Sequence, residues 1–349
     1  MGAPLVKRPP LSIVYLLEDT ALFGGVKIVL HQAELMARRG HRVTVVSKGE
    51  RPAWFPLRAA FLRVPALEPG LLPPADVTVA TFWTTVAAAA AAVASGQAVH
   101  YCQGFEAIYT HNTGEHPAIL EAYRAAVPCF ALSPHLAALV RDRFGKAARV
   151  VPPALAPYWR PAWRVGPRRT VRIVIVNPFE IDWKGVATGL EAVRLLRKQD
   201  VPCRLVRLSQ WPLCEAERAA LVPDEFHYHL QPRQVASLLR RCDLMLAPSW
   251  EQEGFGLPVL EAMACGVPVV ASDISAFRAF AGEGAVLVPF DQPEKFTAGA
   301  REILDSPARW REQRRRGLEA SRAFTQERVA RIAEDALYWV ADGRWTREP

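Results

Sequence analysis

Short apolar runs alternate with helical patterns through the first half of the chain. Ser12–Leu17 is an apolar run that ends in the polar, glycine-bearing segment 18–25, and a helical pattern follows over Val26–Arg39. Gly40 stops that helix, and the apolar run Val43–Ser47 comes next. This succession predicts the opening of a parallel α/β sheet. Further strands are predicted over Val77–Ala80, Ala98–Cys102, Cys129–Leu132 and Arg149–Val151.

The second half repeats this arrangement after a segment without periodicity. Residues 151–169 are rich in Pro, Trp and Arg, which is typical of a linker. Beyond it we predict strands over Val171–Val176, Arg204–Leu208, Phe226–Leu230, Leu244–Ala247, Val267–Ala271 and Ala285–Val288, and helices over Val186–Lys198 and Gln326–Val340. The pattern predicts an α/β chain of two Rossmann-like, doubly wound domains, residues 1–168 and 169–325, facing a central cleft. The last helix, within 326–349, is expected to pack back on the first domain.

Composition and charge narrow the class of protein. Half of the 349 residues are apolar and 22% are charged, which excludes a disordered chain, a collagen-like chain or a disulfide scaffold. Residues 1–170 carry 19 Lys and Arg against 10 Asp and Glu, whereas residues 171–349 carry 24 against 25. The basic excess indicates either a solvated Arg-rich surface or a face that meets anionic lipid or a phosphate-bearing partner. Its scatter along the chain argues against nucleic acid as a partner.

Cysteine and histidine positions indicate neither disulfides nor a metal site. The six cysteines form no CxxC pair and mostly lie in apolar runs, so we expect free thiols in a reducing cytoplasm. His227 and His229 alternate in a predicted strand without a third ligand nearby, which favours structural histidines. The N-terminus lacks the apolar core of a secretory signal. The uncharged stretch Val77–Val99 is mostly Ala with interspersed Thr, which fits a strand and a helix better than a membrane span.

The segment from Ser249 to Asp273 has the most informative chemistry. Pro258 stands near the first position of a predicted helix that Gly266 closes, and glycines bracket the helix start. Such a start offers free backbone N–H groups and a positive dipole end to a phosphate. Glu253 lies just outside this start, and Glu261 lies about 6 Å further along the axis. A phosphate would repel two carboxylates, so we expect them to bind sugar hydroxyls. The alternative is that Glu253 is a helix-start charge and Glu261 a solvated helix residue.

The sequence resembles retaining glycosyltransferase family 4, whose members have the two-domain GT-B fold. The resemblance rests on EGFGLPVLEAMACGVPVVASD, in which seven residues separate Glu253 from Glu261. FGGVKIVLHQAELMARRGHRVTVVS is similar to the family's first glycine loop and helix, and Asp182-Trp183-Lys184-Gly185 to its Lys-Gly loop. The last helix resembles the one that crosses back onto the first domain.

The resemblance implies a role for each matching residue. Glu261 would hold the ribose hydroxyls, Glu253 the hydroxyls of the transferred sugar, and Lys184 would neutralise the diphosphate. The other implied contacts are the backbone amides of Gly254, Phe255, Gly256 and Leu257 with sugar and phosphate, and a close approach of Gly24 and Gly25 to the diphosphate or the acceptor.

Two positions depart from the family's pattern. Residues 177–184 contain no Arg, where the family commonly places a second cation, so leaving-group stabilisation must rest on Lys184, the helix dipole or a cation from elsewhere. Gln103 stands where the family often has a His that contacts the donor sugar. An amide binds a hydroxyl but accepts no proton.

The implied function is transfer of a sugar from a nucleotide-diphosphate sugar to a hydroxyl acceptor with retention. Front-face displacement needs positioning and charge stabilisation more than a protein base. For an inverting reaction the candidate bases are Asp19, Glu106 and His111. We expect no metal and no cofactor, a UDP-, GDP- or dTDP-sugar as donor, and a saccharide or lipid-linked acceptor.

The setting implied is cell-surface polysaccharide or glycolipid synthesis. FWTT and YCQGFE look similar to a subgroup with rhamnosyl- and mannosyltransferases. We expect a cytoplasmic enzyme in peripheral contact with the anionic inner face of the membrane. The alternatives are a GT-B-fold sugar-nucleotide epimerase and a non-catalytic nucleotide-sugar-binding partner of another transferase.

Overall fold

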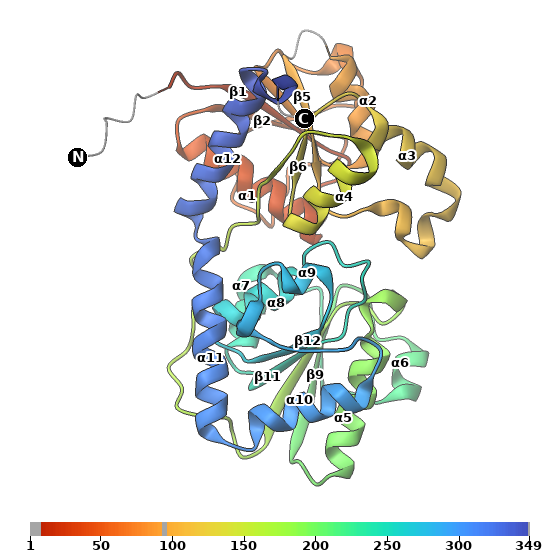
Figure 1. The fold of residues 1–349 in the computed structure, drawn as a ribbon, viewed down its shortest axis with the longest axis vertical. Coiled ribbons are helices and arrows are strands. Elements are labelled where there is room, and N and C mark those ends of the chain that lie inside the picture. The colour runs from red at the N-terminus through yellow and green to blue at the C-terminus, as the bar shows by residue number, and fades with distance from the viewer. Residues whose placement is uncertain (1–7, 93–95, 348–349) are drawn as a thin grey trace, which may run out of the picture. The chain divides into compact units, whose positions relative to one another are not determined.

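The computed structural model describes residues 8–92 and 96–347, which form two compact units. The first unit comprises residues up to Ala154 together with those from Gln326 onward, and the second comprises Leu155–Thr325. Each unit is a parallel sheet covered by helices (Figure 1). This confirms the predicted α/β class with two Rossmann-like units.

Within the described residues, the sheet of the first unit has seven parallel strands in the order β3-β2-β1-β4-β5-β6-β7. They are β1 (Ser12–Leu17), β2 (Arg42–Ser47), β3 (Ala60–Arg63), β4 (Val77–Ala80), β5 (Gln97–Cys102), β6 (Cys129–Ala131) and β7 (Ala148–Val150). The apolar pattern predicts all of these except β3, three of whose four residues are exposed. Its apolar run, Ala59–Leu62, is short and lies between Arg58 and Arg63, so the pattern does not identify it as a strand.

Helices α1 (Gly24–Arg38) and α12 (Gln326–Ala341) are far apart in the chain and lie side by side in the first unit (Figure 1). Glu334 of α12 accepts hydrogen bonds from Arg39 at 2.6 Å and from His41 Nε2 at 3.0 Å. Because Leu11 N donates to Nδ1 of His41 at 3.0 Å, that imidazole joins the start of β1 to α12. The other helices of this unit are α2 (Trp83–Ala91), α3 (His116–Arg124) and α4 (Pro134–Phe144), with 3-10 turns at Pro69–Leu71, Glu106–Ile108, Thr110–Glu115 and Arg344–Arg347.

The described sheet of the second unit has six parallel strands in the order β10-β9-β8-β11-β12-β13. They are β8 (Val171–Val176), β9 (Cys203–Ser209), β10 (Glu225–Tyr228), β11 (Leu244–Ala247), β12 (Val269–Ser272) and β13 (Val286–Val288). The helices are α5 (Val186–Lys198), α6 (Glu215–Ala220), α7 (Pro232–Leu239), α8 (Leu257–Ala264), α9 (Ser275–Arg278), α10 (Pro293–Leu304) and α11 (Pro307–Ser321). Its 3-10 turns are Asp182–Lys184, Gly282–Gly284 and Arg322–Phe324. Apolar side chains fill both faces of this sheet, which is why the central strands β8, β11 and β12 are mainly apolar in the sequence, whereas the edge strand β10 is mixed.

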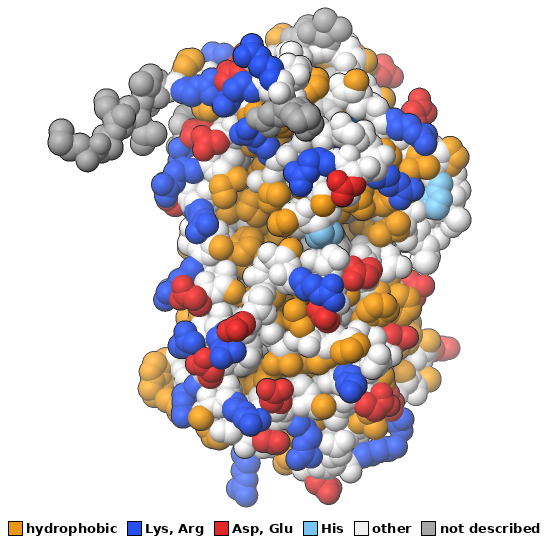
Figure 2. Space-filling view, viewed as in Figure 1, with side chains coloured by type: hydrophobic (Ala, Val, Ile, Leu, Met, Phe, Trp, Pro, Cys, Tyr) orange, Lys and Arg blue, Asp and Glu red, His pale blue; other side chains and the backbone are white. Residues whose placement is uncertain are grey.

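Charged side chains of both signs are mixed on the surface of the second unit. On the face shown in Figure 2, Lys and Arg side chains lie among Asp and Glu side chains over this unit. This distribution agrees with the near balance of charges in residues 171–349.

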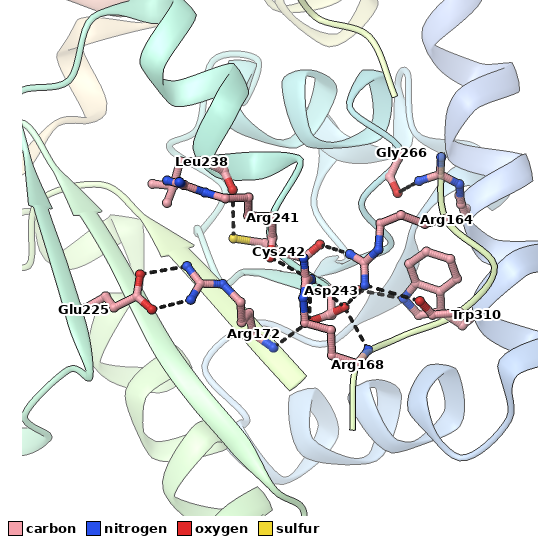
Figure 3. A network of polar contacts seen from close by, with 12 residues as sticks. Arg164, Arg168, Arg172, Glu225, Leu238, Arg241, Cys242, Asp243, Gly266 and Trp310 are labelled. Carbon is pink, nitrogen blue, oxygen red and sulfur yellow. Dashed lines mark hydrogen bonds and ion pairs between the residues drawn. The ribbon is translucent and has the colours of Figure 1, made fainter. Parts of the chain in front are cut away.

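The linker segment is anchored to the second unit through Asp243, whose side chain is fully buried at the start of β11. Arg164 and Arg168 both pair with this carboxylate, and Trp310 Nε1 donates to its backbone oxygen at 2.8 Å (Figure 3). Trp159 lies in the core between the sheet and α8. These contacts explain why residues 155–168, although aperiodic, cluster with the second unit rather than the first.

Candidate functional site

The topology of the second sheet places two loops side by side. Strand β8 pairs with β11 on one side and with β9 on the other, so the strand order reverses direction at β8. In open parallel sheets, ligands bind at this reversal, outside the carboxyl ends of the strands. The loop after β8 carries Lys184 and the loop after β11 carries Glu253.

Lys184 and Glu253 form an ion pair across these two loops. Nζ of Lys184 lies 2.7 Å from Oε2 of Glu253, and their side chains are only 15% and 9% exposed. The backbone fixes the two loops to each other, because Trp250 N donates to Trp183 O at 2.8 Å. The ammonium also lies 4.1 Å from the centre of the Trp183 ring. The structure thus brings together two predicted site residues that are 69 positions apart in the chain.

Two glycines with positive φ shape the helix starts beside this pair. Gly185 (φ 63°) precedes α5 and Gly256 (φ 87°) precedes α8. A Cβ on Gly185 would lie 2.0 Å from Pro248 O, and one on Gly256 would lie 2.2 Å from a ring carbon of Phe277. No side chain of the described residues caps α8, and Pro258 is its second residue, as predicted. Pro258 has no N–H group, and Val259 N and Leu260 N donate to Gly256 O at 3.0 and 3.5 Å. The backbone N–H groups that this helix start offers to an anion are therefore those of Gly256 and Leu257.

The remaining motif residues of the second unit divide into backbone and side-chain candidates. Phe255 is buried, stacked on Phe280 with ring centres 4.5 Å apart, so only its backbone can serve a ligand. Glu261 is 5% exposed on α8. Burial, and then the charge of Glu261, raise the pKa of Tyr158 to about 12. The carboxylate of Glu261 therefore lies near that ring, and the alternative of a solvated helix residue is wrong. Gly254 and Leu257 flank the same helix start.

In the first unit, Gln103 lies against the start of α1. Its Nε2 donates to Thr81 O at 3.2 Å, and a Cβ on Gly25 would lie 3.3 Å from its Oε1. Gly24 and Gly25 form the first turn of α1, two residues before the predicted start. Gln103, Gly24 and Gly25 lie where the strand order of the first sheet reverses, at β1, which pairs with β2 and β4. The space beside Gly25 is thus used by the Gln103 amide.

The three candidate bases of an inverting reaction lie in different environments. Asp19 accepts hydrogen bonds from the backbone of Thr20 at 2.5 Å and of Ala21 at 3.1 Å, as a turn-capping carboxylate does. Glu106 is buried and accepts from Tyr123 Oη at 2.7 Å, and burial raises its pKa to about 7. His111 is exposed and stacks on Tyr109.

The prediction that His227 and His229 alternate within one strand is wrong. Strand β10 ends at Tyr228, and His229 has a left-handed backbone (φ 50°) outside it. Among the described residues, no group of three or more His, Cys, Asp and Glu side chains is arranged to hold a metal ion. Within the same described ranges, no helix has the length and apolar character needed to cross a membrane.

Sequence reasoning missed a buried charge beneath the Lys184 loop. Arg207 of β9 is fully buried and pairs with Glu217 of α6, with Nε 2.5 Å from Oε1. An arginine inside an otherwise apolar strand is the signal that could have revealed it.

Comparisons with known proteins agree with this geometry. Residues 170–306 match the family model described as glycosyl transferases group 1. A GDP-mannose-dependent alpha-(1-6)-phosphatidylinositol dimannoside mannosyltransferase of Mycobacterium tuberculosis is 34% identical over 145 residues, 41% of this chain and 37% of that protein. The match thus spans only about a third of the relative's length.

Solved structures extend the likeness to both units. A sucrose-phosphate synthase from Thermosynechococcus elongatus aligns with a TM-score of 0.74 and 17% identity, covering 96% of this chain and all of that one. Anabaena Alr3699/HepE in complex with UDP-glucose aligns with a TM-score of 0.74 and 15% identity, covering 94% and 99%. At such identities the likeness concerns the fold, and it confirms the predicted GT-B class.

Proposed function

We propose that this protein is a glycosyltransferase that moves a sugar from a nucleotide-diphosphate sugar to a hydroxyl acceptor with retention. The observation that carries the proposal is the Lys184–Glu253 pair beside the glycine-started helix α8, within the segment that matches group 1 glycosyltransferases. A nearly buried cation beside a helix start suits a diphosphate, and nearby carboxylates suit sugar hydroxyls.

Each site residue has a proposed part in the reaction. Lys184 and the N–H groups of residues 254–257 stabilise the diphosphate as it leaves. Glu253 positions the transferred sugar through its hydroxyls while its charge is offset by Lys184, and Glu261 holds the ribose. In the first unit, Gln103, Gly24 and Gly25 bind donor or acceptor groups. The acceptor hydroxyl attacks on the face from which the phosphate departs, and a phosphate oxygen takes its proton.

The acceptor is proposed to be a saccharide or a lipid-linked glycan in polysaccharide or glycolipid synthesis. The mannosyltransferase named above is, by its name, active on a phosphatidylinositol dimannoside, which is an anionic glycolipid. The basic excess of residues 1–170 fits such an acceptor and peripheral contact with an anionic membrane surface. Transfer without a metal ion or cofactor is part of the proposal, and we expect activity to persist in EDTA.

The first experiment is a thermal-shift screen of the full chain against UDP, GDP, dTDP and ADP and their sugars. A ligand that binds only the folded state raises the melting temperature, by linkage. We expect a selective shift that is lost in Glu261→Ala. No shift with any nucleotide for a folded protein would contradict the donor site, and binding without donor hydrolysis or transfer would favour a non-catalytic partner.

A further inference from the structure

We propose that Arg207 is a positioning residue that holds the Lys184 loop in its diphosphate-binding geometry. The inference rests on the proposed donor site and extends it to a residue buried beneath that site. Arg207 lies on β9 and shows no exposed surface, so it cannot itself contact a donor. Its effect must therefore pass through the groups that its guanidinium holds.

The guanidinium of Arg207 is directed at the end of β8. One terminal nitrogen donates to Ile175 O at 2.6 Å and the other to Asn177 O at 2.8 Å. Its Nε donates to Glu217, which is 1% exposed and supplies the compensating charge from α6. Because a buried ion pair contributes little net stability over a well-packed apolar pair, stability alone gives little reason for an arginine here.

The carbonyl held by Arg207 belongs to a residue with unusual backbone geometry. Asn177 has φ 101°, a conformation that non-glycine residues rarely adopt and that needs support from its surroundings. Two hydrogen bonds supply that support: Asn177 N donates to Leu208 O at 3.0 Å, and Asn177 O accepts from the Arg207 side chain. The chain therefore leaves β8 in a direction fixed by β9.

The loop that follows is anchored at both ends. Arg207 fixes the first residue, Asn177, and the Trp183–Trp250 backbone bond fixes the far end beside Lys184. Between these anchors the loop is only a few residues long, so a change at Asn177 is transmitted to the ammonium. A misplacement of about 1 Å at such a site can cost roughly 100-fold in rate.

The test uses a double substitution that avoids leaving one buried charge alone. Arg207→Met with Glu217→Met removes both charges at similar volume, and the full-length fold should survive. The matched control is Arg172→Met with Glu225→Met, an ion pair that joins the amino ends of β8 and β10 in the same sheet. Dissociation constants are measured for UDP, GDP, UMP and GMP in each protein.

We expect the Arg207 and Glu217 double variant to bind its preferred nucleoside diphosphate about tenfold more weakly, with affinity for the monophosphate unchanged. In a Lys184→Ala background the same double substitution should change diphosphate affinity less than twofold. The effects of two substitutions on affinity do not add when both act through one contact. Arg207→Lys, which keeps a charge but cannot reach both carbonyls, should recover part of the affinity. The control pair should leave the affinities unchanged.

Other outcomes separate the two proposals. Additive losses in the Lys184→Ala background, or equal losses for monophosphate and diphosphate, would reduce Arg207 to a structural residue and overturn the inference. If the double variant does not fold, Arg207→Lys is measured instead, alone and in the Lys184→Ala background. If Lys184→Ala itself leaves diphosphate affinity unchanged, the proposed donor site fails instead.

Discussion

The two units share one sheet topology and place different chemistry at the same point of it. Taking strands in chain order within each unit, both sheets run third, second, first, fourth, fifth, sixth, and the first sheet continues to a seventh strand. Both therefore reverse between their first and fourth strands. In the second unit this point carries the nearly buried Lys184–Glu253 ion pair. In the first unit it carries the more exposed Lys48–Glu18 ion pair and the neutral amide of Gln103 against Gly25. The fold supplies the position, and the side chains decide whether an ion pair there is buried.

One buried carboxyl group of each unit, Glu253 and Glu106, has a different kind of partner. Glu253 has a lysine partner, whereas Glu106 of the first unit has a tyrosine hydroxyl as its partner, and burial raises its pKa to about 7. A phosphate-bearing ligand needs a compensating cation, while a hydroxyl-bearing ligand needs neutral donors and acceptors. The comparison is consistent with a donor site in the second unit and an acceptor site in the first.

The largest expected effect contrasts the two helix starts. Gly256→Ala should destabilise the second unit by about 4 kcal/mol, because alanine is strained at φ 87° and its Cβ would meet the buried Phe277 ring at 2.2 Å. Gly25→Ala should cost less than about 1 kcal/mol, since the nearest atom is the movable Gln103 amide at 3.3 Å. Calorimetry of the full chain measures both.

Equal losses of stability for Gly256→Ala and Gly25→Ala would contradict the contrast between a strained helix start at α8 and an unstrained one at α1. Gly70→Ala is a control for the unfolded-state effect of the substitution, because nothing lies within 4 Å of a Cβ built there.

Much of the fold follows from the sequence because both sheets are buried on two faces. Apolar runs gave the strands to within two residues, as for Val171–Val176 and Leu244–Ala247. The exposed edge strand β3 was missed because its apolar run, Ala59–Leu62, is short and lies between two arginines. The linker 155–168 lacked periodicity, so the pattern could not reveal that Arg164 and Arg168 fix it to Asp243.

The site was only partly predictable for a different reason. Local motifs identify residues near one helix, such as Glu253 and Glu261, but the sequence order does not reveal that β8 and β11 are neighbours. The Lys184–Glu253 contact depends on that pairing. Arg207 was missed because its partners are backbone carbonyls, which have no sequence signature.

The next largest effect is a difference between the units in how stability depends on pH. The pKa of Glu106 is raised from 4.5 to about 7, so the folded state resists ionisation that the unfolded chain undergoes. The wild-type protein should lose stability relative to Glu106→Gln as pH rises from about 4.5 to about 7, by up to about 3 kcal/mol, and no further above that. Urea unfolding from pH 4 to pH 9 measures this difference.

Glu225 of the second unit should show the opposite dependence of stability on pH. A hydrogen bond from Arg172 lowers the pKa of Glu225, so its ionised form stabilises the fold above the ordinary pKa of a glutamate. That stability is lost as pH falls through the lowered value. Glu225→Gln should therefore be less stable than the wild type at neutral pH and equal to it in acid. The same direction of change for both glutamates would contradict this account of Glu106 and Glu225.

The smallest expected effect tests whether a nearly buried ion pair distinguishes the two reversal points. Lys184→Met leaves Glu253 nearly buried without its partner and should cost about 2 kcal/mol, most of which Lys184→Met with Glu253→Met should recover. Gln103→Ala removes one neutral hydrogen bond to Thr81 O and should cost about 1 kcal/mol. Raising the salt concentration should change the first cost little, because the pair is largely shielded from solvent. If the double substitution were as destabilising as Lys184→Met alone, the cost would come from lost packing of the lysine stem on Trp183. The contrast between a nearly buried ion pair at one reversal point and the neutral Gln103 hydrogen bond at the other would then not hold.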